Sequence, residues 1–197
     1  SEIKELKNFY INPSSGDSTL SVGGCYYISS LNKNIKLKKL DNIYLGPSYS
    51  NKHVSRAISN FLIKNKNFST SKIKNNKNIV NYISRGKVLG RFKGRMELGQ
   101  RALGNRSILA DPRKPEIIKL INQKIKMRDF WMPFTPSILN EHKEKYLVNE
   151  KKLYCPYMTM AFKTTKLFQK IAPATLHPAD QTTRPQILEK SLNPEYH

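Results

Sequence analysis

The spacing of apolar residues along this chain predicts short helices and strands separated by polar segments. One helix is expected after Ser48 or Ser50, either of which can cap it, because apolar residues then recur on one face: Val54, Ile58, Phe61 and Leu62. A second, short helix is expected over residues 78–84. A strand is expected after it, over residues 87–92.

A further helix is expected after Pro115, since proline suits the first helical turn. Isoleucines follow at helical spacing and predict a buried stripe: Ile117, Ile118, Ile121 and Ile125. Asn122 and Lys126 lie one turn apart and off this stripe, so both are expected to face a ligand. Residues 134–139 and 157–162 are predicted as strands. The tail from Pro173 is predicted to be extended or looped. This mixture of elements indicates an α/β or α+β fold.

Composition narrows the class of protein. The 197 residues, 38% of them hydrophobic, suffice for one core and part of a second domain. The net charge of +21 favours anionic partners such as nucleotides, phosphate esters, RNA or acidic membranes. Lysine, however, occurs mixed with asparagine and isoleucine, which indicates a general compositional bias as much as a binding face.

The two cysteines form no CxxC pair and no cluster with the four histidines, so no structural zinc site is expected. A reducing, cytoplasmic setting is predicted instead. No apolar run approaches the roughly 18 residues that a membrane span needs, so no spanning segment is expected. A membrane is not among the expected partners. The polar start without a methionine indicates no signal peptide and an excised piece of a longer protein.

Residues 94–113 carry the strongest chemical signal. Four arginines (Arg95, Arg101, Arg106 and Arg113) stand among three glycines, with one carboxylate at Glu97 and one hydroxyl at Ser107. Glycine lets the backbone approach a ligand, and arginine offers paired donors to phosphate or carboxylate oxygens. The segment therefore predicts a pocket for a small, multiply charged oxyanion. The alternative is a solvated basic loop, which the interleaved apolar residues disfavour: Ala102, Leu103, Ile108 and Leu109.

The surroundings of this segment are basic as well. Between Arg85 and Arg128 there are thirteen basic and three acidic residues, a field that concentrates anionic substrates. Some side chains have a structural alternative. Glu97 is expected to orient an arginine rather than act as a base, and Ser107 either donates to an anion or caps a turn. Ion pairs with Glu97 or Asp111 are as well supported for Arg106 and Arg113 as ligand binding.

These residues resemble the O-carbamoyltransferase family of nodulation-factor and antibiotic biosynthesis. The matching pieces follow the family order: residues 12–18, Leu45-Gly46-Pro47, residues 94–113, residues 122–136 and residues 173–186, which include Thr183-Arg184-Pro185-Gln186. Leu98 and Gln100 replace the phenylalanine and proline most usual in the signature. Met132 stands where many members carry arginine.

The resemblance implies two domains. Residues 1–28 would end an actin-like, Kae1-like ATPase domain, and residues 29–50 would link it to the second domain. Residues 51–197 would form a YrdC-like α/β (α+β) domain with a mixed twisted sheet and flanking helices, whose closing segment lies beyond His197. The metal-binding histidines of the first domain, for iron or another metal, would precede Ser1.

The implied reaction joins carbamoyl phosphate and ATP, with Mg²⁺, to give carbamoyl-adenylate, releasing phosphate and pyrophosphate. The first domain then transfers the carbamoyl group to a hydroxyl of a sugar, antibiotic or nodulation-type acceptor. Arg101 and Lys126 are predicted to bind the phosphate of carbamoyl phosphate, with Arg184 closing from the late motif. Arg95 and Arg128 are predicted for the nucleotide phosphates. The other predicted substrate-binding residues are Gly94, Glu97, Gly99, Gly104, Arg106, Ser107 and Asn122. Charge stabilisation and positioning are expected to carry the catalysis.

Two rival functions remain at this point. A YrdC-like RNA-binding module would use the charge and show a steep salt dependence, but aromatic residues are not interleaved with arginine as in RNA-binding signatures. A fragment acting only as an interaction domain is the second rival. In the late motif, His177 and Asp180 form either a turn or part of the catalytic site. The acceptor is expected to sit mostly in the first domain.

Overall fold

The computed structural model describes residue 5 and residues 11–40, 42–73 and 75–197. Most of the polar start of the chain, Asp41 in the expected linker and Lys74 in the polar connection after the first predicted helix lie outside the described residues. The division into residues 1–28, 29–50 and 51–197 stays a prediction.

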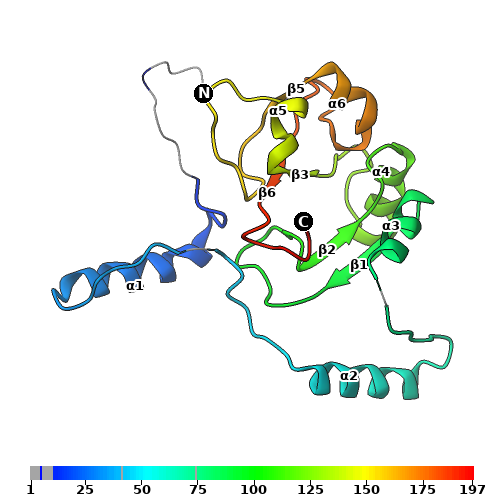
Figure 1. Cartoon of the computed structure of the whole chain (residues 1–197), viewed down its shortest axis with the longest axis horizontal. Helices are drawn as coiled ribbons and strands as arrows, with labels where there is room; N and C mark the ends of the chain where they lie inside the picture. Colours follow the sequence, from blue (N-terminus) through cyan, green and yellow to red (C-terminus); the bar gives the residue numbers. More distant parts are fainter. Residues whose placement is uncertain (1–4, 6–10, 41, 74) are drawn as a thin grey trace.

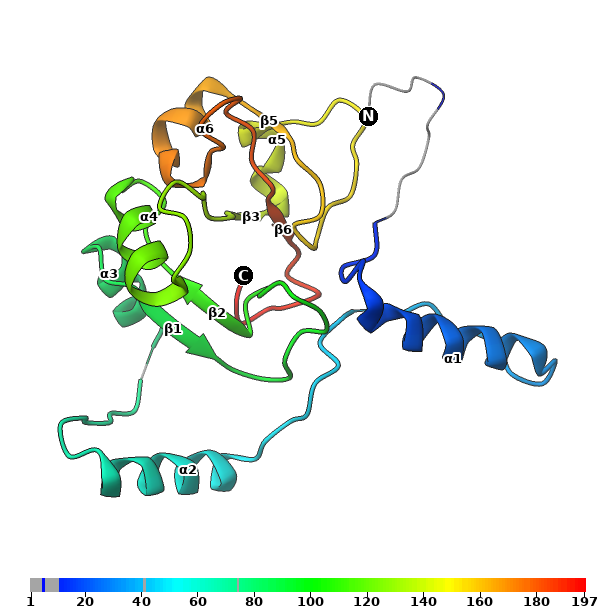
Figure 2. The ribbon, with the colours of Figure 1, turned by 180° about the vertical axis from the view of Figure 1, so that it is seen from behind.

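Two helices project from the body of the molecule (Figures 1 and 2). The 3-10 turn η1 (Asp17–Thr19) leads into α1 (Leu20–Leu31), and α2 (Asn51–Lys64) follows after an extended connection. The predicted cap is confirmed at Ser50, whose side chain accepts a hydrogen bond from the backbone N–H of His53. Neither helix buries a side chain, so the apolar face predicted for α2 is present but exposed.

The helix α3 (Lys77–Ser84) and the strand β1 (Leu89–Phe92) confirm the next two predicted elements. β1 pairs antiparallel with β2 (Arg106–Leu109), with Leu89 opposite Leu109 and Phe92 opposite Arg106. The long loop of residues 93–105 connects the two strands, so the arginine- and glycine-rich segment forms the end of a hairpin. The C-terminal segment passes over this hairpin (Figure 1).

The predicted isoleucine helix is shorter than its pattern suggested. α4 (Glu116–Ile121) buries Ile117 and Ile121, as expected. The chain then widens into a π-helical turn, η2 (Asn122–Lys126), and Ile125 is 48% exposed. A π-helix closes its hydrogen bonds over five residues instead of four, which rotates later side chains off the stripe. The prediction of a buried Ile125 was therefore wrong.

The remaining elements enclose the hydrophobic core. β3 (Ser137–Leu139) pairs in parallel with β6 (Gln186–Leu188), and β4 (Leu147–Val148) pairs antiparallel with β5 (Lys163–Thr164). Between them lie η3 (Asn140–His142), α5 (Lys143–Tyr146), α6 (Lys166–Ile171) and η4 (Pro173–Thr175). The core cluster consists of Ile138, Leu147, Cys155, Phe162, Phe168, Ala172, Leu176 and Ile187.

Residues 157–162 do not form the strand expected there. Met158 has a left-handed backbone with φ of 58°, and pairing begins only at the isolated bridge between Phe162 and Thr183. The α+β class is confirmed. In the described part of the chain the strands pair as three two-stranded sheets, one parallel and two antiparallel. Within the same residues, no helix is both long enough and apolar enough to cross a membrane.

Candidate functional site

A cavity of about 530 Å³ lies between the β1–β2 hairpin, the α4–η2 helix and the segment of residues 133–139. Its volume falls in the range of small-molecule sites. The apolar part of its wall includes Leu109, Ile117, Ile121, Leu139 and Leu188. The polar part includes Arg101, Ser107, Asp111, Lys126, Arg128, Thr135, Ser137, Thr175 and Tyr196.

Three of the predicted cationic residues line this one cavity: Arg101, Lys126 and Arg128. They come from separate elements, namely the hairpin loop, the π-helical turn and the segment after it. The Arg101 guanidinium and the Lys126 ammonium group make no hydrogen bond or ion pair with any described residue. Their donors are therefore available to a ligand.

Asp111 is the acidic residue of the cavity wall, and its charge is already compensated. Its carboxylate accepts hydrogen bonds from Arg113, with Nη2 2.6 Å from Oδ2 and Nε 2.9 Å from Oδ1. These hydrogen bonds hold the pKa of Asp111 below its ordinary value, against the opposing effect of burial. The ion pair with Asp111, which was the alternative to ligand binding for Arg113, is thus observed. The positive charges of Arg101, Lys126 and Arg128 have no acidic partner in the cavity wall.

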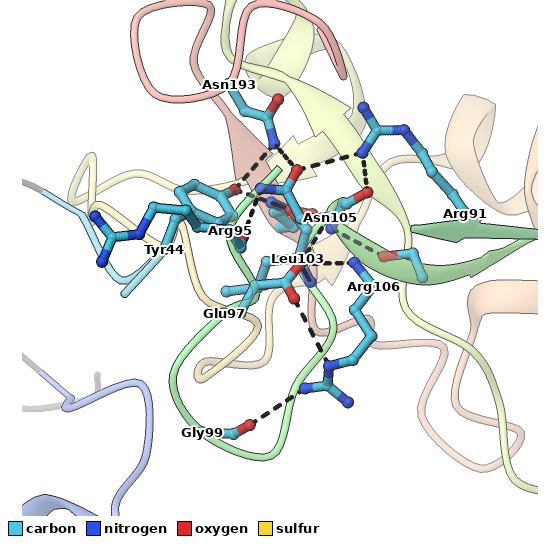
Figure 3. Close-up of polar contacts among 12 residues, drawn as sticks. Tyr44, Arg91, Arg95, Glu97, Gly99, Leu103, Asn105, Arg106 and Asn193 are labelled. Carbon is cyan, nitrogen blue, oxygen red and sulfur yellow. Dashed lines mark hydrogen bonds and ion pairs between the residues drawn. The ribbon is translucent and has the colours of Figure 1, made fainter. Parts of the chain in front are cut away.

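The conformation of the loop depends on Glu97, whose side chain is completely buried (Figure 3). Its Oε1 accepts hydrogen bonds from three backbone N–H groups: Leu103 at 2.8 Å, Asn105 at 2.7 Å and Arg106 at 3.2 Å. Oε2 has no hydrogen bond, but lies 3.9 Å from Nε of Arg106. Glu97 therefore shapes the backbone that carries Arg101, in addition to the expected pairing with an arginine.

Arg95 binds the connection that precedes α2 rather than the cavity. Its Nε donates to the carbonyl of Gly46 at 2.7 Å, and its Nη2 donates to that of Leu45 at 2.9 Å. Backbone hydrogen bonds run beside these contacts, from Gly46 N–H to Met96 and from Leu98 N–H to Ile43. The motif Leu45-Gly46-Pro47 is thereby tied to the arginine loop. In this structure the guanidinium of Arg95 already donates hydrogen bonds to backbone carbonyls of the protein.

Two glycines of the loop are needed for close contacts. Gly99 has φ of 95°, and a Cβ there would lie 2.7 Å from Cβ of Ser14. Gly104 has φ of 113°, and a Cβ there would lie 2.5 Å from the ring of Tyr196. L-residues with a side chain rarely adopt such angles. Gly94, with φ of 71°, lies beside Asn105 at the start of the loop. None of the three lines the cavity; Gly99 lets the loop pack against the N-terminal segment, and Gly104 lets it pack against the C-terminal segment.

Asn122 lies under the cavity rather than in its wall, and its side chain is fully buried. Its amide is engaged with residues 128–132, and its Oδ1 accepts a 2.6 Å hydrogen bond from Nε of Arg128. The predicted surface position for Asn122 is therefore not found, because the chain after η2 folds back and residues 128–132 cover this side chain. A contribution to ligand binding stays a prediction, and in this structure it would act through Arg128.

Comparisons with known proteins bear on what this cavity does. The family profile described as Carbamoyltransferase C-terminus matches residues 80–197, which include the hairpin, the cavity cations and the late motif. The chain belongs to this carbamoyltransferase family.

Individual relatives agree with the family. An uncharacterized protein of Methanocaldococcus jannaschii is 36% identical over 98% of this chain and 32% of its own length. Nodulation protein NolO of Bradyrhizobium diazoefficiens is 29% identical over 96% of this chain and 34% of its own length. Nodulation protein U of Sinorhizobium fredii is 35% identical over 51% of this chain and 17% of its own length. The chain thus spans about a third of the length of the first relatives it matches.

The other predicted site residues of this carbamoyltransferase domain differ in where they lie relative to the cavity. Arg184 is exposed and does not line it. Arg106 reaches the carbonyl of Gly99 at 3.5 Å and pairs with Glu97, outside the cavity wall. Ser107 lines the cavity, and its hydroxyl accepts a 2.9 Å hydrogen bond from the N–H of Gly104. His177 and Asp180 form a turn, with Nδ1 of His177 3.3 Å from Oδ1 of Asp180.

The sequence did not reveal the distant residues that contact the cavity and the arginine loop. Tyr196 lines the cavity, its hydroxyl lies 2.9 Å from Oγ of Ser137, and burial raises its pKa. Gln186 and Tyr44 both donate to the carbonyl of Leu103, each at 2.9 Å. No local pattern signals such contacts, which join residues 59 to 83 positions apart.

No group of three or more His, Cys, Asp or Glu side chains that could hold a metal ion occurs in the described ranges. The cavity wall instead offers arginine, lysine and hydroxyl donors. Such donors bind oxyanions directly.

Proposed function

We propose that this chain is the part of a carbamoyltransferase that binds carbamoyl phosphate and ATP and forms carbamoyl-adenylate. The observation that supports it is the meeting of Arg101, Lys126 and Arg128 on one cavity whose carboxylate, Asp111, is already paired. Carbamoyl phosphate carries one phosphate and ATP three, so both substrates match a wall with uncompensated positive charge.

The net reaction consumes carbamoyl phosphate, ATP and one water, and yields carbamoyl-adenylate, phosphate and pyrophosphate. Negative charge concentrates on phosphoryl oxygens in each step. Arg101 and Lys126 would stabilise the phosphate of carbamoyl phosphate, and Arg128 would bind a nucleotide phosphate. The chain's contribution is then positioning and charge stabilisation, with Mg²⁺ arriving bound to ATP.

Residues more distant from the cavity have supporting roles in this proposal. Ser107 offers its hydroxyl at the cavity wall, and Arg184 closes from the late motif if residues 177–184 move toward bound substrate. Arg95, Glu97, Arg106 and the loop glycines fix the shape of the segment that carries Arg101. The remainder of the full-length protein would transfer the carbamoyl group to a hydroxyl acceptor in the cytoplasm.

The test is the release of pyrophosphate from ATP, in the presence of Mg²⁺ and dependent on carbamoyl phosphate. It is measured for the chain and for its Arg101→Ala variant. Arg56→Ala is the matched control, because Arg56 is exposed on α2, away from the cavity. Release that needs both substrates and Arg101, but not Arg56, supports the proposal. A chain that binds neither substrate while folded contradicts it.

RNA binding is the second candidate, and one feature favours it. Residues 42–96 contain no aspartate or glutamate, so all charged side chains of α2, α3 and their connections are basic. RNA binding through this stretch would weaken steeply with salt and would not depend on Arg101. Binding of a single-stranded RNA that survives in Arg101→Ala, with no binding of carbamoyl phosphate by either protein, would favour this function.

A further inference from the structure

Asn122 is a fully buried asparagine whose side-chain polar atoms are all used. Its Nδ2 donates to the carbonyls of Met132 at 2.8 Å and Phe130 at 3.3 Å. Its Oδ1 accepts from Nε of Arg128 at 2.6 Å. A buried amide with this set of partners fixes the segment of residues 128–132 against the end of α4.

The backbone is arranged to bring Arg128 back over Asn122. η2 ends at Lys126, and Met127 takes a left-handed conformation with φ of 51°. The N–H of Arg128 then donates to the carbonyl of Asn122 at 3.1 Å. The Met127 side chain is 82% exposed, so packing of that side chain does not account for the reversal. The reversal of the chain at Met127 places Arg128 against Asn122.

The Arg128 guanidinium is held on one face and at one nitrogen. Its central carbon lies 4.6 Å from the centre of the Phe134 ring, and Nε is bound to Asn122. Within the described residues, no carboxylate pairs with it. Partial burial lowers its pKa. The two terminal nitrogens are left as donors at the wall of the cavity.

We propose that Asn122 is a positioning residue, which fixes Nε of Arg128 so that both terminal nitrogens face one phosphate group in the cavity. A guanidinium held in this way forms paired hydrogen bonds without first losing side-chain freedom. The inference rests on the proposed function for the ligand. It assigns to Asn122 an indirect effect on affinity, exerted through Arg128.

A double-mutant cycle tests this dependence, with carbamoyl phosphate affinity measured by calorimetry for Asn122→Ala, Arg128→Ala and the double variant. Each single substitution is expected to weaken binding about tenfold, since Arg128→Ala removes the hydrogen bonds of a charged group and Asn122→Ala removes the contact that orients it. The double variant is expected to bind no more weakly than Arg128→Ala alone. Losses that multiply in the double variant would overturn the inference. Gln123→Ala, on an exposed neighbour, is the control.

A measurement on the unaltered chain covers the case in which Asn122→Ala does not fold. The Nε–H proton of Arg128, assigned by its loss in Arg128→Lys, is expected to exchange with water far more slowly than that of exposed Arg56. Equal exchange rates would overturn the inference. If Arg128 is protected but the chain binds neither carbamoyl phosphate nor inorganic phosphate, the proposed function fails instead, and with it the phosphate-binding role of Arg128.

Discussion

The arginines of residues 94–113 differ in what holds their guanidinium groups. Arg95 donates to two backbone carbonyls, Arg106 pairs with buried Glu97, and Arg113 pairs with Asp111. Arg101 has no described partner and lines the cavity. The same glycine-rich segment therefore contains three arginines that contact the protein and one, Arg101, whose guanidinium remains available for a ligand.

At this scale the sequence predicted which cations gather better than what each of them contacts. Clustered cations and glycines predicted an anion pocket; Arg101, Lys126 and Arg128 do line one cavity, and its binding of an anion stays a prediction. The sequence did not separate Arg95 from Arg101, since both are arginines beside glycine. Their difference depends on residues 45 and 46, whose carbonyls lie beside Arg95 only in the folded chain.

The Asp111–Arg113 pair gives a prediction for pH. Hydrogen bonds from Arg113 lower the pKa of Asp111 in the folded chain. Stability from this pair is therefore complete above the unfolded pKa, about 4 for aspartate, and is lost as pH falls through the lower folded value. In Arg113→Ala the side-chain hydrogen bonds and the charge of Arg113 are lost, while burial, the backbone hydrogen bond from residue 113 and the charge of Lys114 remain, so the pKa of Asp111 should rise. Carbon-detected titration of the Asp111 carboxyl group measures this. An unchanged midpoint would contradict the assignment of Arg113 as its partner.

At the scale of elements, local patterns predicted where helices begin but not how they end or pack. Ser50 caps α2 as expected, whereas η2 interrupts the isoleucine pattern of α4. The apolar residues predicted to share one face of α2 include Phe61, whose side chain is 49% exposed. Helical spacing identifies an apolar face, but whether another element covers that face depends on long-range packing.

Two helix caps should differ in effect because their helices differ in burial. Ser50 caps α2, which buries no side chain, and Thr165 caps α6, which buries Phe168. Thr165→Ala should lower the free energy of global unfolding by about 1 kcal/mol. Ser50→Ala should leave it unchanged and only speed amide exchange within α2. Chemical denaturation and hydrogen exchange measure the two effects. Equal losses of global stability would show that α2 packs on the body.

At the scale of the whole molecule, distant segments converge on the arginine loop (Figure 3). Asn193 donates to the side chain of Asn105 at 3.0 Å, and Tyr44 donates to the carbonyl of Leu103. Tyr196 packs on Gly104, and the Arg91 guanidinium lies 5.3 Å from the centre of its ring. The helix and strand mixture was predictable from periodicity. These contacts were not, because they join residues far apart in the chain.

This convergence predicts that Gly104 is more sensitive to substitution than Gly90 of the same hairpin. Gly104→Ala places a Cβ against the Tyr196 ring and keeps an unfavourable φ, so it should lower the unfolding free energy by about 1–3 kcal/mol. Gly90→Ala is the matched control on β1, where a Cβ meets nothing within 4 Å. Chemical denaturation of both variants measures the difference. Equal stabilities would show that the C-terminal segment does not rest on this loop.

The most direct test of the account is calorimetric titration of the folded chain with carbamoyl phosphate, with and without a non-hydrolysable ATP analogue. We predict saturable binding that falls about tenfold or more in Arg101→Ala and stays unchanged in Arg56→Ala, because Arg101 lines the cavity and Arg56 does not. No binding to the folded chain, or equal binding by both variants, would contradict the assignment of the cavity as an anion site.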